Sequence, residues 1–349
     1  MNKNPKIAFN NAGYIKKGED ISNIVENLST ATNNIIINGL MRRGFSEIYQ
    51  FNSSSVKLDE INVPVARVVK LKLIEKNCGK NKKGIKPLKY GDSVCSYSGM
   101  FQMTLDEFAI IFIRGDDIDT NPNFLEIFES AQRPLYINSP KGTMETLDKF
   151  DIKKRAEKDG IKIPQTMNVI DFQEMLGCLK EIFGRYKVIK ARFGFGGKEV
   201  WRVTSGTPEK ELRKIFGMCP GGAVLQEYKE IIERGDLRLN VFDGEVLGNR
   251  ALLRQASRGK WKTNIDLGGS HSPYEIDEKI IKTASKVSEA YAEVRLHGVD
   301  LFLDGTFIET NAYPTTLGYL HNHFGFKAEE VILDKLLEEI NCLLPFSSI

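Results

Sequence analysis

Three oxygen-bearing side chains stand close together near the C-terminal end of the chain. Asp300 precedes an Asp304-Gly305 pair, and Glu309 and Asn311 follow in the run Phe307-Ile308-Glu309-Thr310-Asn311. An Asp-Gly pair between two strand-like runs predicts a β-hairpin, in which Glu309 and Asn311 share one face. Carboxylate and amide oxygens of this kind suit Mg²⁺ held together with a substrate's phosphates. The alternative is a solvated hairpin whose polar residues bind no metal.

A glycine-rich stretch further upstream has the composition of a phosphate-covering loop. Val188-Ile189-Lys190 is typical of a short buried strand, Phe193-Gly194-Phe195-Gly196-Gly197-Lys198 follows it, and Val200-Trp201-Arg202-Val203 resumes a strand pattern. A Walker-type loop needs Gly-Lys-Ser/Thr and then a helix, whereas Glu199 follows Lys198 here, so that motif is excluded. Glycines between two strands still let backbone N–H groups approach phosphates and let the loop close as a lid. An ordinary hairpin turn is the alternative.

The remaining sequence predicts an alternating α/β protein of more than one domain. At 349 residues, with 41% hydrophobic and 27% charged residues, the chain exceeds a comfortable single core. Residues 1–134 combine a helical pattern over Ile21–Arg43 with strand runs at Lys6–Phe9, Ser46–Tyr49 and Phe108–Ile113. Helices are expected near Thr146–Asp159 and Asp171–Phe183.

Composition narrows the class of protein further. No stretch approaches a membrane span, and the N-terminus lacks the apolar segment of a signal peptide, so we predict a cytoplasmic protein without membrane partners. The net charge of +3 is too small to imply a nucleic-acid partner, and the odd count of 5 cysteines indicates reduced thiols. Residues 70–89 are lysine-rich and predict an exposed loop, which either attracts an anionic substrate or is merely solvated.

Taken in order, these segments resemble the ATP-grasp superfamily and, within it, the prokaryotic glutathione synthetases. The resemblance implies an α/β (α+β) ATP-grasp fold with an N-terminal pre-ATP-grasp domain at 1–134, a nucleotide-lid subdomain at 135–225 and a catalytic subdomain at 226–349. Weaker similarity extends to the N-terminus. The matching segments are Asn138-Ser139-Pro140, Lys149, Lys190 with the glycine loop, Gln226-Glu227-Tyr228, Gly235-Asp236-Leu237-Arg238, Phe242-Asp243-Gly244-Glu245, Arg254, Asn264, Gly268-Gly269 and the Asp300, Glu309, Asn311 set.

The resemblance also implies an activity, that of an ADP-forming ligase joining a carboxylate to an amine through an acyl phosphate. ATP and two Mg²⁺ ions, with Mn²⁺ as an alternative metal, are the implied cofactors, and Glu309 is expected to bridge the ions. The implied ATP contacts are Lys149, Lys190, Gly194, Gly196, Gly197, Gln226, Glu227, Tyr228, Asp236 and Arg238; the metal ligands are Asp300, Glu309 and Asn311; the catalytic candidates are Arg254, Arg238 and Asn264; and Arg114 lies near the substrate. Arg254 is the candidate that stabilises charge on the intermediates, because its fork pairs with phosphate or carboxylate oxygens.

Three departures from the family pattern concern the substrate. After Asn311 the family typically carries Ser-Pro-Thr and then an arginine, whereas this chain reads Ala312-Tyr313-Pro314-Thr315-Thr316-Leu317-Gly318-Tyr319. His271 stands where an arginine is common, and the loop after Arg114 lacks the family's prolines. A missing arginine removes a bidentate carboxylate partner, so the ATP half of the sequence supports the resemblance more strongly than the substrate half.

Three hypotheses follow. The first is a glutathione synthetase that joins γ-glutamylcysteine to glycine, and the second is a related ligase for another amino acid, peptide or natural-product carboxylate. The third is a nucleotide-binding protein without ligase activity, as synapsin-like members of this fold are; the intact metal ligands and Arg254 weigh against it. Small-molecule substrates and a homo-oligomer are implied. His321-Asn322-His323 falls short of a zinc pattern, so contact with the acceptor substrate is the preferred interpretation.

Overall fold

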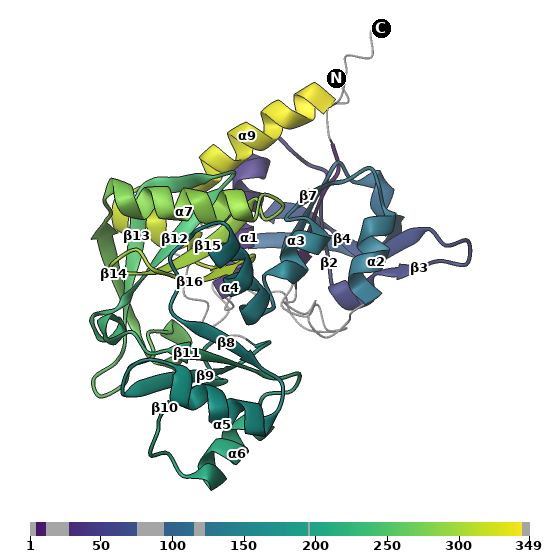
Figure 1. Ribbon diagram of the computed structural model, residues 1–349. Helices are drawn as coiled ribbons and strands as arrows, with labels where there is room; N and C mark the ends of the chain where they lie inside the picture. The colour runs from purple at the N-terminus through teal and green to yellow at the C-terminus, as the bar shows by residue number, and fades with distance from the viewer. Residues whose placement is uncertain (1–4, 12–27, 75–93, 115–122, 195, 344–349) are drawn as a thin grey trace, which may run out of the picture. The chain divides into compact units, whose positions relative to one another are not determined.

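The computed structural model describes residues 5–11, 28–74, 94–114, 123–194 and 196–343. Their contacts divide the chain into two compact units, each coloured along the chain in Figure 1. The first unit is Met1–Thr143 with Glu293–Leu296 and Ala312–Ile349, and the second is Met144–Ala292 with His297–Asn311. The subdomain limits at 134 and 225 stay a prediction. Most of the lysine-rich segment, the loop after Arg114 and Phe195 lie outside the described residues.

The first unit contains a seven-stranded mixed sheet in the order β3-β4-β2-β1-β6-β7, with β5 paired to β4. β1 lies between β2 and β6 and runs parallel to both. The ring of Phe9 on β1 stacks on that of Phe112 on β6, with 4.5 Å between the ring centroids. Every residue of β6 is buried, as expected for a central parallel strand. The three strands predicted for this region are confirmed. The strands are β1 (Ile7–Asn11), β2 (Ile48–Phe51), β3 (Lys57–Leu58), β4 (Pro64–Ile74), β5 (Val94–Thr104), β6 (Ile110–Arg114) and β7 (Leu135–Ile137).

Helices of the first unit pack on one another through α1, which contacts α8 and α9. Arg42 and Arg43 at the end of α1 form ion pairs with Glu329 and Asp334 of α9 at 3.1 and 2.6 Å. The predicted helix over Ile21–Arg43 is confirmed from residue 28 onward, and its earlier residues are not described. The helices are α1 (Leu28–Arg42), α2 (Asn123–Ser130), α8 (Leu317–Phe324) and α9 (Ala328–Leu343), and α3 (Pro140–Glu145) begins in this unit.

The second unit contains two sheets, of which the four-stranded one is antiparallel in the order β10-β9-β11-β8. Its core joins Ile189 and Leu225 of the sheet to Met175 of α5 and Ile215 of α6, so both helices cover one face (Figure 1). Asp171 caps α5 by accepting a hydrogen bond from Glu174 N at 2.9 Å. The elements are β8 (Thr166–Val169), α5 (Phe172–Glu181), β9 (Tyr186–Ala191), β10 (Val200–Thr204), α6 (Glu209–Gly217) and β11 (Ala223–Glu227).

The five-stranded sheet of the second unit has the order β14-β13-β12-β15-β16. Helix α7 packs against β12 and β13, and α4 contacts β16 and β8. These elements are α4 (Lys149–Lys158), β12 (Asp236–Phe242), β13 (Glu245–Gln255), β14 (Ser270–Glu275), α7 (Glu278–Ala290), β15 (Leu296–Phe302) and β16 (Phe307–Asn311). Short 3₁₀ turns occupy Ser53–Ser55, Leu105–Glu107, Glu230–Arg234 and Ile265–Leu267.

The predicted C-terminal hairpin is confirmed as β15 and β16. Gly305 has a φ of +81°, and Asp304 accepts a hydrogen bond from Thr306 N at 2.9 Å, which closes the turn. Asp300 pairs with Glu309 and Gly298 with Asn311. Side chains directly opposite one another in antiparallel strands share a face, so Asp300, Glu309 and Asn311 lie on the same side of the sheet.

A buried histidine on β15 lies on the opposite side of this hairpin. His297 Nδ1 and Thr310 Oγ1 are 2.7 Å apart, Nε2 and Ser288 Oγ are 3.0 Å apart, and burial lowers the pKa of His297 from 6.5 to about 3. Between about pH 6.5 and about pH 3 the unfolded chain therefore binds a proton at His297, whereas the folded chain does not. The contribution of neutral His297 to the free energy of unfolding is fully present above about pH 6.5. As the pH is lowered from about 6.5 towards about 3, this contribution decreases by up to about 1.4 kcal/mol per pH unit.

We expect His297→Gln, which cannot take up that proton, to weaken the acid sensitivity of folding. Urea unfolding at about pH 7 and about pH 5 should show a smaller stability loss for the variant than for the wild type. His323→Gln is the matched control, because His323 is exposed on α8. Parallel pH dependence in wild type and His297→Gln would exclude His297 as the source.

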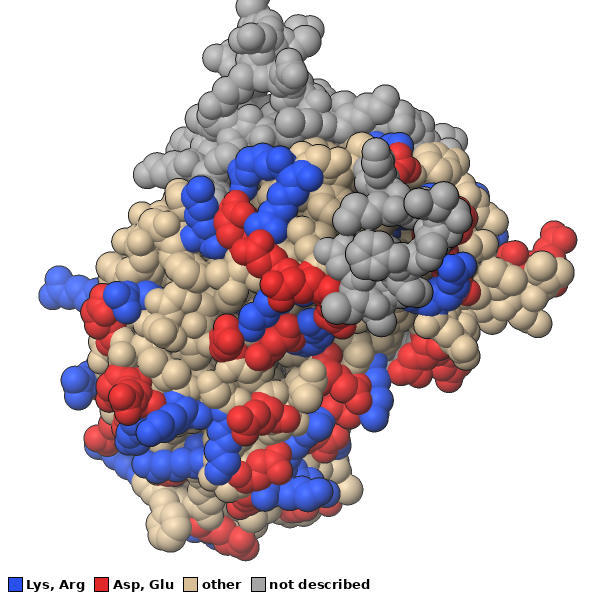
Figure 2. Space-filling model, turned by 90° about the horizontal axis from the view of Figure 1, so that it is seen from above, with Lys and Arg blue, Asp and Glu red and all other residues tan. Residues whose placement is uncertain are grey.

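Surface features of the described residues are ordinary for a globular protein. None of the helices described is long and apolar enough to cross a membrane. The face presented in Figure 2 carries Lys and Arg side chains interspersed with Asp and Glu. Cys178 and Cys219 are buried and form no disulfide within the described part of the chain.

Candidate functional site

The first turn of α4 positions Lys149 against the glycine loop. Asp148 caps the helix by accepting from Phe150 N at 3.0 Å, and its other oxygen accepts from Arg192 Nε at 2.7 Å. Lys149 N donates to Arg192 O at 3.0 Å, and Lys149 Nζ donates to Gly194 O. The lysine is therefore tied to the start of the loop at both its backbone and its ammonium group.

The glycine loop is held at its other end by the segment after β13. Gly194, Gly196 and Gly197 have φ values of +132°, +67° and +69°, a region that favours glycine. A Cβ on Gly197 would lie 2.3 Å from Asn264 Oδ1, and Lys262 Nζ donates to Gly197 O at 2.8 Å. The structure thus brings the predicted Lys149, the glycines and Asn264 together, and adds Lys262.

We expect Gly197→Ala to lower turnover about ten-fold or more and to destabilise the fold by about 1–2 kcal/mol. The left-handed backbone is strained for alanine, and the new methyl group would displace Asn264. Gly177→Ala is the control, since Gly177 lies within α5 with no atom within 4 Å of its added Cβ, and it should stabilise the helix without changing activity. Equal activity in both variants would show that Gly197 has no role in the site.

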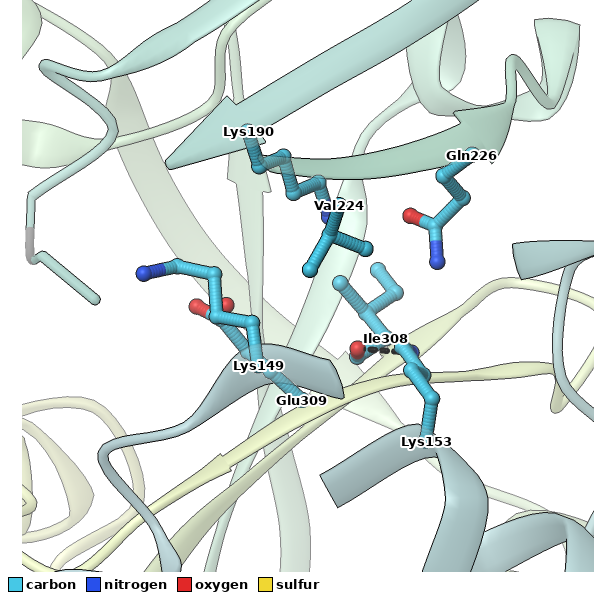
Figure 3. A pocket seen from close by; sticks show the side chains of 7 residues that line it. All are labelled: Lys149, Lys153, Lys190, Val224, Gln226, Ile308 and Glu309. Atoms are coloured by element: carbon cyan, nitrogen blue, oxygen red, sulfur yellow. Dashed lines mark hydrogen bonds between the residues drawn. The ribbon is translucent and has the colours of Figure 1, made fainter. Parts of the chain in front are cut away.

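A pocket lies between the two sheets of the second unit, with about 210 Å³ of empty space counting the part open to solvent. Figure 3 shows Lys190, Val224 and Gln226 reaching it from the four-stranded sheet, and Ile308 and Glu309 from β16. Lys149 and Lys153 of α4 complete the lining. Apolar Val224 and Ile308 can hold a flat ring, while three amines and one carboxylate favour an anionic group beside it.

Burial affects the pKa of each of the three lysine amines in the pocket. It lowers the pKa of Lys149 and Lys190, and holds that of Lys153 well below its ordinary value, against the opposing pull of Glu309. The side-chain amine of Lys190 forms no ion pair or hydrogen bond with the residues that the structure describes. A polyanion in the pocket would supply negative charge beside Lys149 and Lys190.

Beside the pocket, two aspartates and two arginines form a buried charge network. Arg238 binds both oxygens of Asp300, at 2.7 Å for Nη2 to Oδ2, and Arg254 Nη2 donates to the same Oδ2 at 2.7 Å. Arg254 also binds Asp236, with Nε 3.2 Å from Oδ1. The arginines are 7% exposed, and Asp236 and Asp300 are 2% and 1% exposed. Nη1 of Arg254 has no hydrogen-bond partner among the described residues, so it can still donate to a ligand.

The pKa values of the two carboxyl groups in this network shift in opposite directions. Burial alone would raise the pKa of Asp300, but its two guanidinium partners hold that pKa below the ordinary value. Burial raises the pKa of Asp236 against the pull of Arg254, and the charge on Asp300 adds to the rise. Asp300 therefore has the lower pKa of the two carboxyl groups.

The hairpin face fits a magnesium site centred on Glu309. Glu309 forms no ion pair within the described part of the chain, whereas the oxygens of Asp300 are bound by arginines. Asn311 lies on the same face, so a carboxylate, an amide and a second carboxylate adjoin one another. Among the described residues there is no group of three or more His, Cys, Asp and Glu that could hold a metal. Carboxylate and amide oxygens open to water are the donors that suit Mg²⁺ held together with phosphates.

Other residues selected from the sequence occupy defined places. Gln226 donates to Thr166 Oγ1 at 2.9 Å, and the N–H of Glu227 is already bonded to Gln165 O at 2.9 Å. Tyr228 is buried, and its hydroxyl accepts from Arg202 at 3.0 Å. Asp236, an implied ATP contact, is paired with Arg254, and its contact with the nucleotide stays a prediction.

Two further groups of residues belong to the first unit. Arg114 is buried and donates to Pro314 O at 2.6 Å, which places it against the segment that departs from the family pattern. His321 and His323 lie on α8, where the rings of His323 and Tyr319 are 6.3 Å apart. Their contact with a substrate stays a prediction.

Sequence reasoning missed Lys153, which is one helical turn after Lys149 and nearly fully buried. The spacing of the two lysines was a usable signal, because residues four apart lie on the same face of a helix. Lys262 was also missed, and its contact with Gly197 could not be found from local sequence.

The two sheets, the glycine loop and the cationic pocket between them define an ATP-grasp protein. The model of the RimK-like ATP-grasp domain matches residues 146–336, which is more than half of the chain. The chain belongs to the RimK-like ATP-grasp family, whose members are ATP-dependent ligases. The resemblance to the ATP-grasp superfamily is thereby confirmed.

Curated relatives extend this result. The coenzyme γ-F420-2:α-L-glutamate ligase of Methanocaldococcus jannaschii is 30% identical over 209 residues, covering 58% of this chain and 69% of the relative. The tetrahydromethanopterin:α-L-glutamate ligase of the same organism is 29% identical over 249 residues, covering 69% and 81%. A glutathione synthetase of Prochlorococcus marinus is 26% identical over 155 residues, covering 43% and 49%. The similarity to the glutamate ligases is therefore the more extensive one.

Solved structures agree on the fold. D-cycloserine synthetase DcsG superposes with a TM-score of 0.58 at 15% identity, covering 95% of this chain and 99% of that one. The ATP-grasp ligase PsnB, complexed with minimal precursor, Mg and ADP, gives a TM-score of 0.55 at 15% identity, covering 96% and 98%.

Proposed function

We propose that this ATP-grasp ligase joins L-glutamate, through its amino group, to a carboxylate of an acceptor molecule, with ATP converted to ADP and phosphate. The observation that carries the proposal is the pocket in which Lys149, Lys190 and Glu309 meet between two sheets. The extended similarity to α-L-glutamate ligases supports glutamate as the amine. The chemical class of the molecule that carries the carboxylate is determined by testing several candidates in the same assay.

The reaction needs an activated carboxylate, because amide formation from a free carboxylate is uphill in water. An acceptor oxygen attacks the γ-phosphorus of ATP and ADP leaves; the amine then attacks the acyl carbon, loses a proton, and phosphate leaves. Lys149 and Lys190 would neutralise phosphate oxygens, and the glycine loop would exclude water above them. Glu309 and Asn311 would hold Mg²⁺, which would supply positive charge beside the phosphates. Asp300, whose oxygens are bound by Arg238 and Arg254, would lie next to that ion.

Arg254 is proposed to stabilise the acyl phosphate and the tetrahedral intermediate. Its Nε and Nη2 are occupied by Asp236 and Asp300, which fixes the plane of the guanidinium. The remaining Nη1 can then donate to an oxyanion without reorganising, which is how preorganised donors accelerate a reaction. Arg238 would act beside the phosphates, Asn264 at the loop, and Arg114 toward the substrate.

Glutathione synthesis is the second candidate. The motif order and the Prochlorococcus relative favour it. The absence of an arginine from Ala312–Tyr319 weighs against it, since that residue would pair with a substrate carboxylate.

The test is Mg²⁺-dependent ADP release by the purified full chain, with mass spectrometry of the products. L-glutamate is supplied with peptides ending in glutamate and with small molecules carrying a glutamyl tail, and γ-glutamylcysteine with glycine runs alongside. A product heavier by one glutamyl residue supports the proposal, whereas glutathione alone establishes the second candidate. ATP binding without turnover on any pair would favour a nucleotide-binding protein without ligase activity.

A further inference from the structure

Lys153 is a buried amine without a carboxylate partner at hydrogen-bonding distance. Its side chain is 3% exposed, and Nζ donates to Phe307 O at 2.9 Å and to Ile308 O (Figure 3). The ammonium also lies 4.7 Å from the centre of the Phe307 ring. Burying a charged amine is costly, so a lysine here needs a reason that an apolar side chain of similar length would not satisfy.

The two carbonyl groups that Lys153 binds lie at an irregularity in β16. Leu301 pairs with Phe307 and the next pair is Asp300 with Glu309, so Ile308 is an extra residue on β16, a β-bulge. A bulge leaves backbone groups outside the ladder and changes the direction of the side chains that follow. Here the side chain that follows is Glu309.

The edge position of β16 makes this arrangement dependent on α4. β16 ends the five-stranded sheet among the described strands, so no further strand can accept or supply hydrogen bonds on its outer side. Helix α4 covers that side, and Lys153 is the donor it contributes. Unsatisfied buried carbonyl groups are disfavoured, and the lysine satisfies both at once.

We infer that Lys153 is a positioning residue, which fixes the bulge at Ile308 and so directs Glu309 toward the metal. This inference rests on the proposed metal role of Glu309. The same helix then carries both Lys149 and the support for Glu309, which couples the phosphate contact to the metal ligand in one rigid element.

The experiment compares Lys153→Met with Lys154→Met, the matched control, because Lys154 is exposed on the same helix. One readout is the Mg²⁺ concentration for half-maximal ADP release, and the other is binding of a fluorescent ATP analogue with Mg²⁺ and with EDTA. Loss of a residue that supports a metal ligand costs about 10–100-fold in metal affinity, so the Mg²⁺ requirement of Lys153→Met should rise by that factor. Analogue binding in EDTA should change little, while the gain on adding Mg²⁺ should be lost.

Three results would overturn the inference. The first is an unchanged Mg²⁺ requirement in Lys153→Met. The second is an equal loss of analogue affinity with and without Mg²⁺, which would indicate that Lys153 contacts the nucleotide directly. The third is the same rise of the Mg²⁺ requirement in Lys154→Met. If Lys153→Met does not fold, Lys153→Gln, which keeps a side-chain NH2 group that can donate, is subject to the same criteria. Glu309→Gln is measured in parallel: an Mg²⁺ response retained in that variant shows that the proposed metal site has failed, independently of Lys153.

Discussion

Glu309→Gln should lower Mg²⁺-dependent turnover by more than about 100-fold while leaving the fold intact. Loss of an indirect support costs up to about 100-fold in metal affinity, so loss of the charged ligand itself should cost at least that much. Glu309 forms no ion pair with the described residues, so the substitution breaks none. The measurement is ADP release across a range of Mg²⁺ concentrations, with thermal unfolding of the same samples.

The control for this variant is Glu275→Gln, which removes a carboxylate that is 75% exposed on β14 of the same sheet. It should match the wild type in turnover and Mg²⁺ requirement. Turnover of Glu309→Gln close to that of the wild type would remove Glu309 from the metal site, and a large fall in its unfolding temperature would assign the residue a structural role instead.

Lys190→Met should weaken ATP binding and stabilise the protein at the same time. A charge-assisted hydrogen bond to phosphate contributes about 1.5–3 kcal/mol, so ATP affinity should fall roughly 10–100-fold. Without nucleotide the amine pays a burial cost and has no ion-pair partner among the described residues. An apolar side chain of similar length should therefore raise the free energy of unfolding by about 1 kcal/mol or more.

Opposite changes in affinity and stability separate a binding role for Lys190 from a structural one. Isothermal titration with ATP gives the first quantity, and urea unfolding without nucleotide gives the second. Lys210→Met on the exposed side of α6 should change neither. If Lys190→Met were less stable than the wild type, the charge of Lys190 would stabilise the fold itself. The proposed contact of Lys190 with a phosphate would then be without its main evidence.

The specificity of the ligase is a separate matter from its ATP chemistry. Arg114 contacts the carbonyl of Pro314, within the stretch where the sequence departs from the glutathione synthetase pattern. Both residues belong to the first unit, whereas the pocket, the charge network and the hairpin belong to the second. The residues proposed to bind ATP can thus be retained while the segment around Pro314, proposed to lie near the substrate, changes, which fits relatives that differ in the names of their substrates.

Local sequence was sufficient to determine the elements that carry the site. The Asp304-Gly305 pair and the strand-like runs on either side of it predicted a hairpin with Glu309 and Asn311 on one face, since both signals depend only on neighbouring residues. The apolar run before Lys190 and the glycines after it predicted two strands joined by a turn for the same reason. Motif order then indicated the superfamily, which the domain match confirms.

Only the tertiary structure decided how the charged groups pair. Asp300 was expected at a metal and Asp236 at the nucleotide; in the structure Arg238 and Arg254 both bind Asp300, and Arg254 also binds Asp236, because β12 and β13 bring these arginines beside β15. The burial of Lys153 likewise follows from the contact of α4 with a bulged edge strand distant in sequence. Periodicity specifies which face a side chain occupies, whereas its charge partner depends on which distant strand or helix packs on that face.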